Sequence, residues 1–440
     1  MTDADPKKQS PLSALASGFR KRTLVTARLG AKLGSLLARK TFSIRSLDKE
    51  VDEEEAVKAA TELLADLDGL KGLVMKFGQM ASYLNPSLPP KAQRILARLQ
   101  SSSRPMEWAQ IEVVVRQELG DAPEALFEQF AHTPFAAASI GQVHRARYEG
   151  RDVAVKVQYP GVDRLLESDL KTVGRMFRWF FALSALDTRG LLAELQERIR
   201  QECDYEAEAA NQRLFGRLMA NPRVLVPSVV EARSATRVIT SELVDGQEFN
   251  SFVEASTQGE RDAAGALIFD TAFECIFRHC IYNADPHPGN YLFLTDGRVA
   301  FLDFGCVKRF SAGFIDRWKR LALTVLDGRK DDLRDALNAT GMVGNPKRFD
   351  YDYHWDLLQY IYQPFLQAEP FTFTHEYVGE SFDTLMFNNP NKYSTAIPPD
   401  WLFVNRLQWG LNSVLAHLNA TADWGSMFRR ALQQPTRPVP

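Results

Sequence analysis

Residues 282–305 constrain the fold of this chain more than any other stretch. Two short apolar runs, Tyr291–Leu294 and Val299–Leu302, are separated by Thr295–Arg298, which contains Asp-Gly. Apolar runs of this length around an Asp-Gly turn predict a tight β-hairpin. The two ends of a hairpin lie side by side, so residues just before and just after it should meet at one edge.

Three polar side chains stand at that edge. Asp285 and Asn290 precede the hairpin with the spacing Asp-x-x-x-x-Asn, and Asp303 follows it in Asp-Phe-Gly. Phosphoryl transfer from ATP uses such a set: the Asn and the second Asp bind Mg²⁺, and the first Asp lies near the nucleophile. Each piece is common by itself, but their order and spacing around a hairpin together predict a kinase-like catalytic loop. We therefore predict Asp285 as the base and Asn290 and Asp303 as metal ligands.

The composition is typical of a large globular protein. The chain has 440 residues, of which 45% are hydrophobic and 25% charged, enough for two or three domains or lobes. The net charge of −2 argues against general nucleic-acid binding. The four cysteines lack paired metal-binding spacing and favour a reduced, cytoplasmic compartment. The apolar runs Met176–Leu186 and Trp401–Leu418 are too short or too polar to span a bilayer.

The first segment of the chain is basic. From Pro6 to Leu47 there is no acidic residue, and lysines and arginines alternate with leucines. This pattern is typical of a basic, partly amphipathic helix, and such a helix can lie on an anionic membrane surface as a peripheral contact. A flexible basic arm, or a helix packed on the body of the protein, explains the pattern equally well.

Helical patterns follow the boundary at Asp48. The longest, residues 56–84, includes Gly72 and Gly78, each of which lowers helix stability by roughly 1 kcal/mol relative to Ala. We therefore expect another part of the molecule to approach this helix closely. Trp108–Leu119 is predicted to be a further helix.

A predicted strand, Asp152–Gln158, carries Lys156 in Val-Ala-Val-Lys. This is the position of the phosphate-binding lysine in the small lobe of a kinase. Side chains alternate along a strand, so Val155 and Val157 should face away from Lys156.

The loop before the strand is rich in alanine where ordinary kinases have glycine. Alanine allows a helical turn and disfavours positive φ, which predicts a stiffer nucleotide loop. Its candidate nucleotide-binding residues are Ala136, Ala137, Ala138, Ser139 and Gly141.

Lys156 requires a carboxylate partner. A helix predicted over Leu191–Met219 offers several, and spacing alone does not choose among them; they are Glu194, Glu197, Glu202, Glu206 and Glu208.

Two further strands are predicted at Val224–Val229 and Arg237–Val244, and Asp245-Gly246 is predicted to form a turn between two lobes. The backbone of Glu242 and Val244 should then meet an adenine edge.

The rest of the chain is predicted to be mostly helical. Leu267–Ile281 leads into the catalytic loop, and Phe314–Leu326 is already helical only about ten residues after Asp303. No Ala-Pro-Glu follows, and Ala284 stands where an ordinary kinase has Arg. A peptide-binding platform ordered by phosphorylation is therefore not expected. The tail from Gln434 is predicted to be disordered.

These motifs together resemble the UbiB/AarF family of atypical kinase-like proteins, which includes coenzyme Q biosynthesis accessory proteins. Lys76-Phe77-Gly78-Gln79 is similar to the family's Lys-x-Gly-Gln signature, and residues 136–143 are similar to its Ala-rich nucleotide loop. Lys156, Asp285, Asn290 and Asp303 match its nucleotide lysine, catalytic-loop pair and metal-binding Asp-Phe-Gly. Asn283 departs from the family, which often has His there.

The resemblance also implies roles for other residues. Lys76 and Gln79 would face the nucleotide phosphates from a helix folded over the active site. Glu202 and Glu208 match the two carboxylates of the family's Glu-Cys-Asp-Tyr-x-x-Glu-Ala helix, which implies Glu202 as the partner of Lys156 and Glu208 as a further nucleotide-site residue.

The implied fold is α+β, kinase-like and two-lobed, with an N-terminal helical extension packed over the active site. The expected organisation is a basic arm (1–47), a helical extension (48–130), a small lobe (131–245), a helical large lobe (246–433) and a tail (434–440).

Three functions fit these residues. The first is an ATP-binding, Mg²⁺-dependent ATPase acting in isoprenoid-quinone or lipid metabolism, with a lipid or quinone precursor and lipid-biosynthesis enzymes as partners. The second is a phosphotransferase for a small hydroxyl or amino substrate. The third is a nucleotide-gated scaffold without catalysis. Protein phosphorylation and nucleic-acid binding are not expected.

Overall fold

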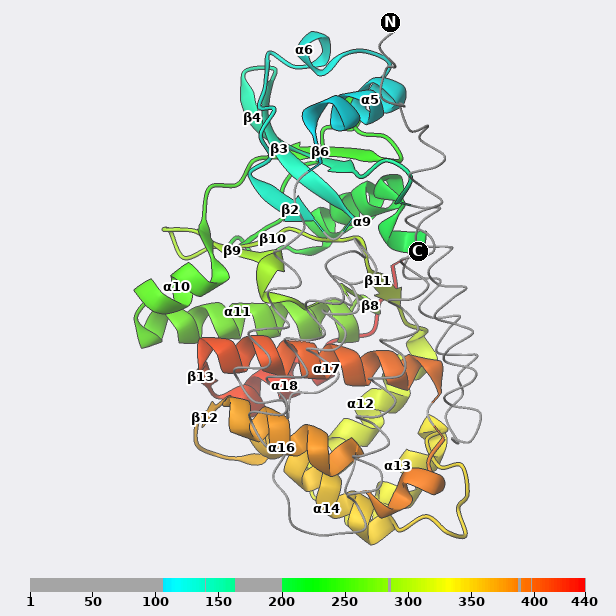
Figure 1. Cartoon of the computed structure of the whole chain (residues 1–440). Coiled ribbons are helices and arrows are strands. Elements are labelled where there is room, and N and C mark those ends of the chain that lie inside the picture. The colour runs from blue at the N-terminus through cyan, green and yellow to red at the C-terminus, as the bar shows by residue number, and fades with distance from the viewer. Residues whose placement is uncertain are drawn as a thin grey trace, which may run out of the picture. The chain divides into compact units, whose positions relative to one another are not determined.

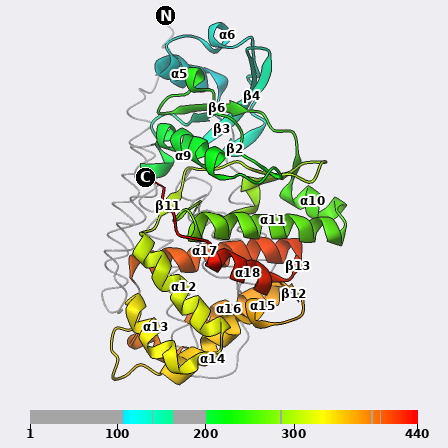
Figure 2. The same cartoon turned by 180° about the vertical axis from the view of Figure 1, so that it is seen from behind.

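The computed structural model describes residues 106–138, 140–162, 200–283, 286–386, 389–396 and 398–439. Lys76, Gln79, Ser139 and Asp285, together with the basic arm, lie outside these residues. Almost all described residues belong to one compact unit, which includes Pro105–Pro160 and Arg198–Pro440. Within this unit most strands gather toward one end and most helices toward the other, as Figures 1 and 2 show from opposite sides.

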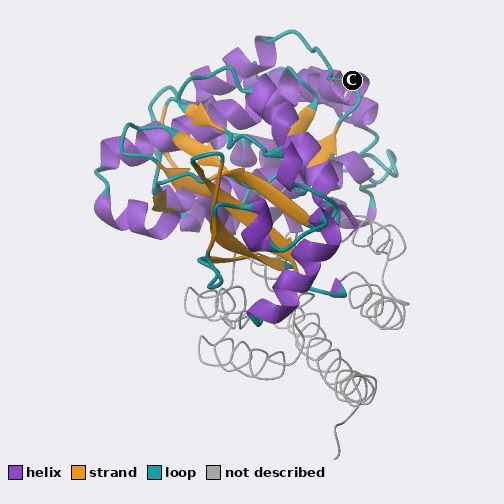
Figure 3. Cartoon of the chain, turned by 90° about the horizontal axis from the view of Figure 1, so that it is seen from above, coloured by secondary structure: helices purple, strands orange, loops and turns teal. Residues whose placement is uncertain are grey.

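An antiparallel sheet with the order β1-β3-β4-β6 forms the small lobe, and β2 also pairs with β3. Its strands are β1 (Gln129–Phe130), β2 (Ala136–Ala138), β3 (Gly141–Tyr148), β4 (Arg151–Gln158) and β6 (Val238–Glu242). Two helices, α5 (Trp108–Leu119) and α9 (Tyr205–Leu218), pack against this sheet, and α6 (Pro123–Leu126) follows α5. Figure 3 shows the strands and helices of the chain from above.

The central β3–β4 hairpin explains how the small lobe presents Lys156. Its two-residue turn has positive φ at both Glu149 (50°) and Gly150 (72°), as a type I′ turn requires. Along β4, Val155 and Val157 are fully buried, whereas the Lys156 side chain keeps 21% of its surface exposed. The predicted alternation is therefore confirmed.

The predicted hairpin after the catalytic loop is also confirmed. It consists of β9 (Tyr291–Phe293) and β10 (Val299–Phe301), which pair antiparallel with Val299 opposite Phe293. Gly297 in its turn has φ +82°, a conformation that favours glycine. Two short strands, β5 (Val224–Leu225) and β7 (Gln247–Glu248), extend this hairpin to the order β5-β10-β9-β7.

Helices make up most of the large lobe. They are α10 (Phe249–Ala255), α11 (Gln258–Phe277), α12 (Ala312–Leu326), α13 (Leu333–Thr340), α14 (Tyr351–Ile361), α15 (Gln363–Leu366), α16 (His375–Met386), α17 (Pro399–Leu418) and α18 (Trp424–Gln433). Two-stranded pairs join β8 (Ile281–Asn283) to β11 (Val307–Arg309) and β12 (Phe371–Thr372) to β13 (Thr421–Ala422). Short 3₁₀ turns occur at Glu231–Arg233, Pro288–Asn290, Lys330–Asp332 and Pro390–Tyr393.

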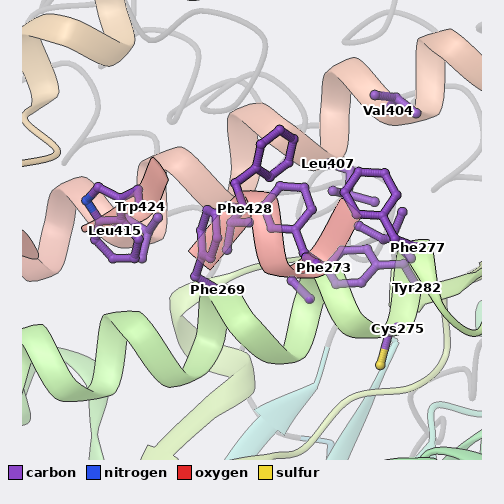
Figure 4. Packing of buried hydrophobic residues seen from close by; sticks show 14 of the residues in the cluster. Phe269, Phe273, Cys275, Phe277, Tyr282, Val404, Leu407, Leu415, Trp424 and Phe428 are labelled. Carbon is purple, nitrogen blue, oxygen red and sulfur yellow. The ribbon is translucent and has the colours of Figure 1, made fainter. Parts of the chain in front are cut away.

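Helix α11 is the centre of the large-lobe core. It begins at Gln258, earlier than the predicted Leu267, because Thr257 and Glu260 form a capping box that satisfies two free N–H groups. Its phenylalanines recur every four residues, so they share one face. On that face Phe273 packs edge-on against Phe428 of α18 at 4.9 Å, and Phe269 packs against Trp424 at 5.0 Å (Figure 4). Aromatic pairs at such distances add to the burial energy of the large-lobe core.

Two predictions about the chain outside the core are corrected. The predicted helix Leu191–Met219 is interrupted: Cys203 and Asp204 are not helical, and the Asp204 carboxylate caps the new helix α9 by accepting the Ala207 N–H at 3.0 Å. The predicted disorder of the tail is wrong for residues 434–439. The start of this tail is held by Lys319, whose ammonium donates to the Gln434 carbonyl at 2.7 Å.

None of the helices in the described part of the chain is both long enough and apolar enough to span a membrane.

Candidate nucleotide site

The ion pair between Lys156 and Glu208 is the centre of the site. The Lys156 ammonium donates to both carboxylate oxygens of Glu208, at 2.7 and 2.9 Å, and the Glu208 side chain is only 4% exposed. Burial by itself would lower the pKa of Lys156, but the carboxylates of Glu208 and Asp303 outweigh it and raise that pKa above its ordinary value. Lys156 is therefore held as a cation, ready to bind an anionic group.

The partner of Lys156 is thus Glu208, and the implied pairing with Glu202 is wrong. The interruption at Cys203 and Asp204 gives the physical reason, because Glu202 ends the helical turn before it. Glu208 lies one turn inside α9, on the side that faces β4. The choice between the two carboxylates depends on where α9 begins, and Asp204, a favoured N-cap residue, was the sequence signal for it.

Asp303 lies beside this ion pair. Its Oδ1 accepts the Gly305 N–H at 2.8 Å, and a Cβ placed on Gly305 would lie 3.3 Å from Asp303 Oδ1 and 3.5 Å from Glu208 Oε2. Within the described residues the second carboxylate oxygen of Asp303 accepts no hydrogen bond, so it is available to a cation. The predicted lysine and metal-binding aspartate are therefore brought together, with Glu208 between them.

The hairpin also brings Asn290 to Asp303. Asn290 ends the 3₁₀ turn Pro288–Asn290, and its backbone carbonyl accepts the N–H of Leu302, the residue before Asp303, at 3.0 Å. The predicted convergence at the hairpin edge holds for these two residues; Asp285 lies outside the described part of the chain.

Helix α9 contacts the Asp-Phe-Gly segment through two residues that the sequence interpretation missed. The Asn211 amide donates to the Phe304 carbonyl at 3.1 Å, and the Phe215 ring lies 5.1 Å from the fully buried Phe304 ring. Glu208, Asn211 and Phe215 are spaced i, i+3 and i+7, so they share one helical face. That spacing was the signal that could have identified them.

The alanine-rich loop is a strand rather than a helical turn. Ala136, Ala137 and Ala138 pair with Val143, Gln142 and Gly141 in that order, so the alanines form a strand and not the helical turn that alanine also allows. Gly141 is required by close packing, because a Cβ there would overlap the Val157 carbonyl of β4 and lie 3.0 Å from the Tyr205 hydroxyl. The loop therefore pairs with β3, which packs closely against β4, the strand that carries Lys156.

The predicted adenine-binding segment follows β6. The Leu243 N–H donates to the Asp152 carbonyl at 3.1 Å and the Glu242 N–H to the Ser228 carbonyl at 2.8 Å. Among the described residues, the Val244 N–H makes no hydrogen bond, so it is available to a ligand. Contact of Glu242 and Val244 with adenine stays a prediction.

The donor set fits a magnesium ion. Mg²⁺ prefers oxygen ligands and is commonly bound by one or two carboxylates together with substrate phosphates. Asp303 supplies a carboxylate with an available oxygen, and Asn290 supplies an amide. No group of three His, Cys, Asp or Glu side chains forms a metal cluster in the described ranges.

The segment after Asp-Phe-Gly is short and paired. Strand β11 runs antiparallel to β8, with Val307 opposite Asn283 and Arg309 opposite Ile281. Helix α12 begins at Ala312, capped by the Ser311 hydroxyl. The predicted shortness of this segment is confirmed.

Comparison with known proteins agrees with this geometry. Residues 98–337 match the ABC1 atypical kinase-like domain. The chain is 29% identical over 414 residues to the mitochondrial atypical kinase coq-8 of Caenorhabditis elegans, covering 89% of this chain and 54% of that protein. It is 29% identical over 390 residues to the mitochondrial atypical kinase COQ8B of Rattus norvegicus, covering 83% of this chain and 73% of the relative. The chain thus spans about half the length of the worm protein.

A solved structure gives the same result for the fold. The complex of Rv3197 with erythromycin from Mycobacterium tuberculosis superposes with a TM-score of 0.67 at 30% identity, covering 88% of this chain and 99% of that one. The two-lobed α+β kinase-like fold is therefore confirmed. Because residues 98–337 match the domain and the fold agrees, the chain belongs to the ABC1, or UbiB, family of atypical kinase-like proteins.

Proposed function

We propose that this chain is an ATP-binding, Mg²⁺-dependent atypical kinase-like ATPase that supports isoprenoid-quinone (ubiquinone) or lipid metabolism. The observation that carries the proposal is the Lys156–Glu208 ion pair beside Asp303. A lysine held charged by a buried carboxylate, next to a carboxylate with an available oxygen, matches the requirements for binding a nucleotide with its metal. The quinone or lipid role rests on kinship with the family.

The residues divide the work as follows. Lys156 binds the phosphates, and Glu208 holds its ammonium in place. Asn290 and Asp303 would hold Mg²⁺, which when bound neutralises charge on the phosphates. Asp285 would orient a water or a hydroxyl as the base. Val244 would receive the adenine edge through its N–H, with Glu242 beside it.

A protein substrate is disfavoured by the segment after Asp-Phe-Gly. Its pairing with β8 and the start of α12 at Ala312 leave only Gly305 to Ser311 between the site and the helix. In ordinary kinases a longer, phosphorylation-ordered segment forms the peptide platform. Water or a small hydroxyl compound needs no such platform.

The test compares Asp303→Asn with Asp296→Asn, a matched control at the far turn of the same hairpin, where Asp296 binds Arg298 at 2.7 Å. Thermal unfolding is followed with ATP alone, with Mg-ATP and without ligand. A ligand at one hundred times its dissociation constant stabilises by about 2.7 kcal/mol, which gives a measurable shift. We expect a Mg²⁺-dependent shift in the wild type and in Asp296→Asn, and its loss in Asp303→Asn.

Product analysis then separates the chemistry. Free phosphate as the product supports the ATPase, whereas phosphate transferred to a metabolite would identify a small-molecule phosphotransferase. Nucleotide binding with no turnover, with or without anionic vesicles, would contradict both and favour a scaffold. Turnover that survives Asp303→Asn would also contradict the proposed site.

We infer a membrane-surface location from the basic segment Pro6–Leu47, while the relatives bear mitochondrial or chloroplastic names. Flotation with anionic vesicles, comparing the full chain with one that begins at Asp48, tests this. Equal flotation of the two would contradict a membrane-binding arm.

A further inference from the structure

Two asparagine side chains bind consecutive backbone carbonyls at the metal-binding aspartate. The Asn283 amide donates to the Asp303 carbonyl, and the Asn211 amide donates to the Phe304 carbonyl at 3.1 Å. Asn283 belongs to β8 of the large lobe, and Asn211 belongs to α9 of the small lobe. The two peptides that follow Asp303 are therefore held one from each lobe. We refer to Asn211 and Asn283 as the amide clamp.

The clamp fixes the direction of the Asp303 carboxylate. Its Oδ1 is already bound to the Gly305 N–H at 2.8 Å, so rotation of either of the two peptides that follow Asp303 would break a hydrogen bond. Phe304 limits rotation further, because its fully buried ring packs against Phe215 of α9. Metal sites depend on such outer groups, and their loss typically weakens metal binding 10–100-fold.

Helix α9 carries both Glu208, which contacts Lys156, and Asn211, which contacts the Asp-Phe-Gly segment. Glu208 holds Lys156 for the phosphates, and Asn211, one turn further on, holds the segment that carries Asp303. A displacement of α9 would disturb the lysine and the metal-binding carboxylate together. Phosphate binding and metal binding should therefore be coupled through one helix.

We propose that Asn211 and Asn283 are positioning residues that orient Asp303 for a divalent cation bound with the nucleotide. This inference rests on the proposed function, because it presupposes Mg²⁺-dependent nucleotide binding. It assigns a role to Asn283, the residue that departs from the family's usual His: its amide N–H supplies a donor to the Asp303 carbonyl. It also assigns Asn211 a role at the metal site rather than only in the packing of α9.

The chain offers a closely matched control. Gln212, next to Asn211 on α9, is 3% exposed and also donates its side-chain amide to a backbone carbonyl, that of Pro227, at 2.6 Å. Gln212→Leu removes a buried bond of the same kind from the same helix, but on a side away from Asp303. It should lower thermal stability as Asn211→Leu does, without changing metal affinity.

The experiment measures binding of a non-hydrolysable ATP analogue by calorimetry over a range of Mg²⁺ concentrations, on the full chain. The variants are Asn211→Leu, Asn283→Ala, Asn283→His and Gln212→Leu. We expect the first two to raise the apparent Mg²⁺ dissociation constant at least tenfold, while affinity for the analogue without Mg²⁺ stays within about twofold. Asn283→His, whose ring can donate an N–H, should restore most of the metal affinity. Circular dichroism identifies any variant that does not fold. If Asn211→Leu is such a variant, the comparison of Asn283→Ala with Asn283→His tests the inference.

Three results would overturn the inference. If the wild type requires Mg²⁺ but Asn211→Leu and Asn283→Ala both keep wild-type Mg²⁺ affinity, the positioning role of the amide clamp is refuted. The proposed function is then unaffected. An equal loss in Gln212→Leu would show a general effect of destabilising α9. A wild type that binds the analogue without regard to Mg²⁺ would overturn the proposed function, and the clamp with it.

Discussion

Lys156 on β4 and Glu208 on α9, 52 residues apart in sequence, are joined by two hydrogen bonds from a single ammonium group. Removing one partner of a buried ion pair leaves an unpaired charge, which costs about 3–5 kcal/mol when burial is complete. Lys156 retains 21% of its surface, so the cost here should be smaller. We expect Glu208→Gln to lower the free energy of unfolding by about 1–3 kcal/mol, within the range for buried polar groups, and to abolish most nucleotide-dependent stabilisation.

Thermal unfolding with and without Mg-ATP measures both effects of Glu208→Gln. Glu206→Gln is the control, because Glu206 lies on the same helix but is exposed and binds only Thr236 among the described residues. Retention of the full nucleotide shift in Glu208→Gln would contradict the role given to this ion pair.

Gly410 of α17 leaves room for the catalytic loop. A Cβ at this position would overlap Cγ of Pro286, the residue after Asp285. Alanine usually stabilises a helix interior relative to glycine by about 1 kcal/mol, but overpacking costs about 1–3 kcal/mol. We expect Gly410→Ala to reduce ATP turnover far more than nucleotide affinity, because the displaced loop precedes the β9–β10 hairpin and includes Asp285, the proposed base, whereas Lys156 lies on β4.

Turnover and analogue affinity are compared for Gly410→Ala and for Gly216→Ala. Gly216 is also inside a helix, but a Cβ there meets only Val226 at 3.8 Å, an ordinary contact. Gly216→Ala should leave turnover unchanged. A Gly410→Ala protein with wild-type turnover would show that the loop tolerates this displacement.

His354 should make the large lobe sensitive to acid. It is 6% exposed, and burial lowers its pKa to about 4. Between pH 6.5 and 4 the unfolded chain takes up a proton at His354 and the folded chain does not, so the free energy of unfolding falls as the pH falls. A shift of this size corresponds to about 3 kcal/mol, lost progressively below pH 6.5 and complete near pH 4.

Urea denaturation between pH 8 and pH 4 measures this loss for the wild type and for His354→Phe. The variant should lack this part of the pH dependence, while His132→Phe, at an exposed position, should keep it. Identical pH profiles for the wild type and His354→Phe would contradict a buried neutral histidine.

The C-terminal tail should contribute to stability through Lys319. This lysine is 9% exposed, and its ammonium donates to the Gln434 carbonyl and to the Thr436 hydroxyl, at 2.7 and 3.0 Å. Ending the chain at Gln433 leaves a buried ammonium without these acceptors, at a cost of about 1–3 kcal/mol.

In the truncated chain, Lys319→Met should recover most of that loss, because it removes the unpaired charge. Chemical denaturation of the four combinations forms a double-mutant cycle. Additive effects of truncation and substitution would show that the tail and Lys319 act independently.

Features that depend only on neighbouring residues were the ones predicted best from the sequence. The β9–β10 hairpin follows from its Asp-Gly turn and the apolar runs beside it, and the orientation of Lys156 follows from strand alternation. The family and its fold followed because several motifs occur in one order. The start of α11 was predicted too late, although Thr257 and Glu260 have the spacing of a capping box in the sequence.

Other features depend on distant parts of the chain. The choice of Glu208 as the partner depends on Asp204, which ends one helix and starts the next. The path of the tail depends on Lys319, 115 residues earlier. Asn211 contacts Phe304 across 93 residues, and no local pattern requires an amide at that position. Such contacts are decided when the lobes pack, and residue order alone does not specify them.

Strand β11 lies in the segment after Asp-Phe-Gly, which in many kinases is a mobile activation segment. It is paired with β8 along its length, and Lys308 in its middle binds Asp400 at the start of α17 at 2.7 Å. A segment paired with β8 and bound to α17 through Lys308 has little freedom to rearrange. We therefore expect phosphorylation-driven ordering of this segment, as in many kinases, not to control the site.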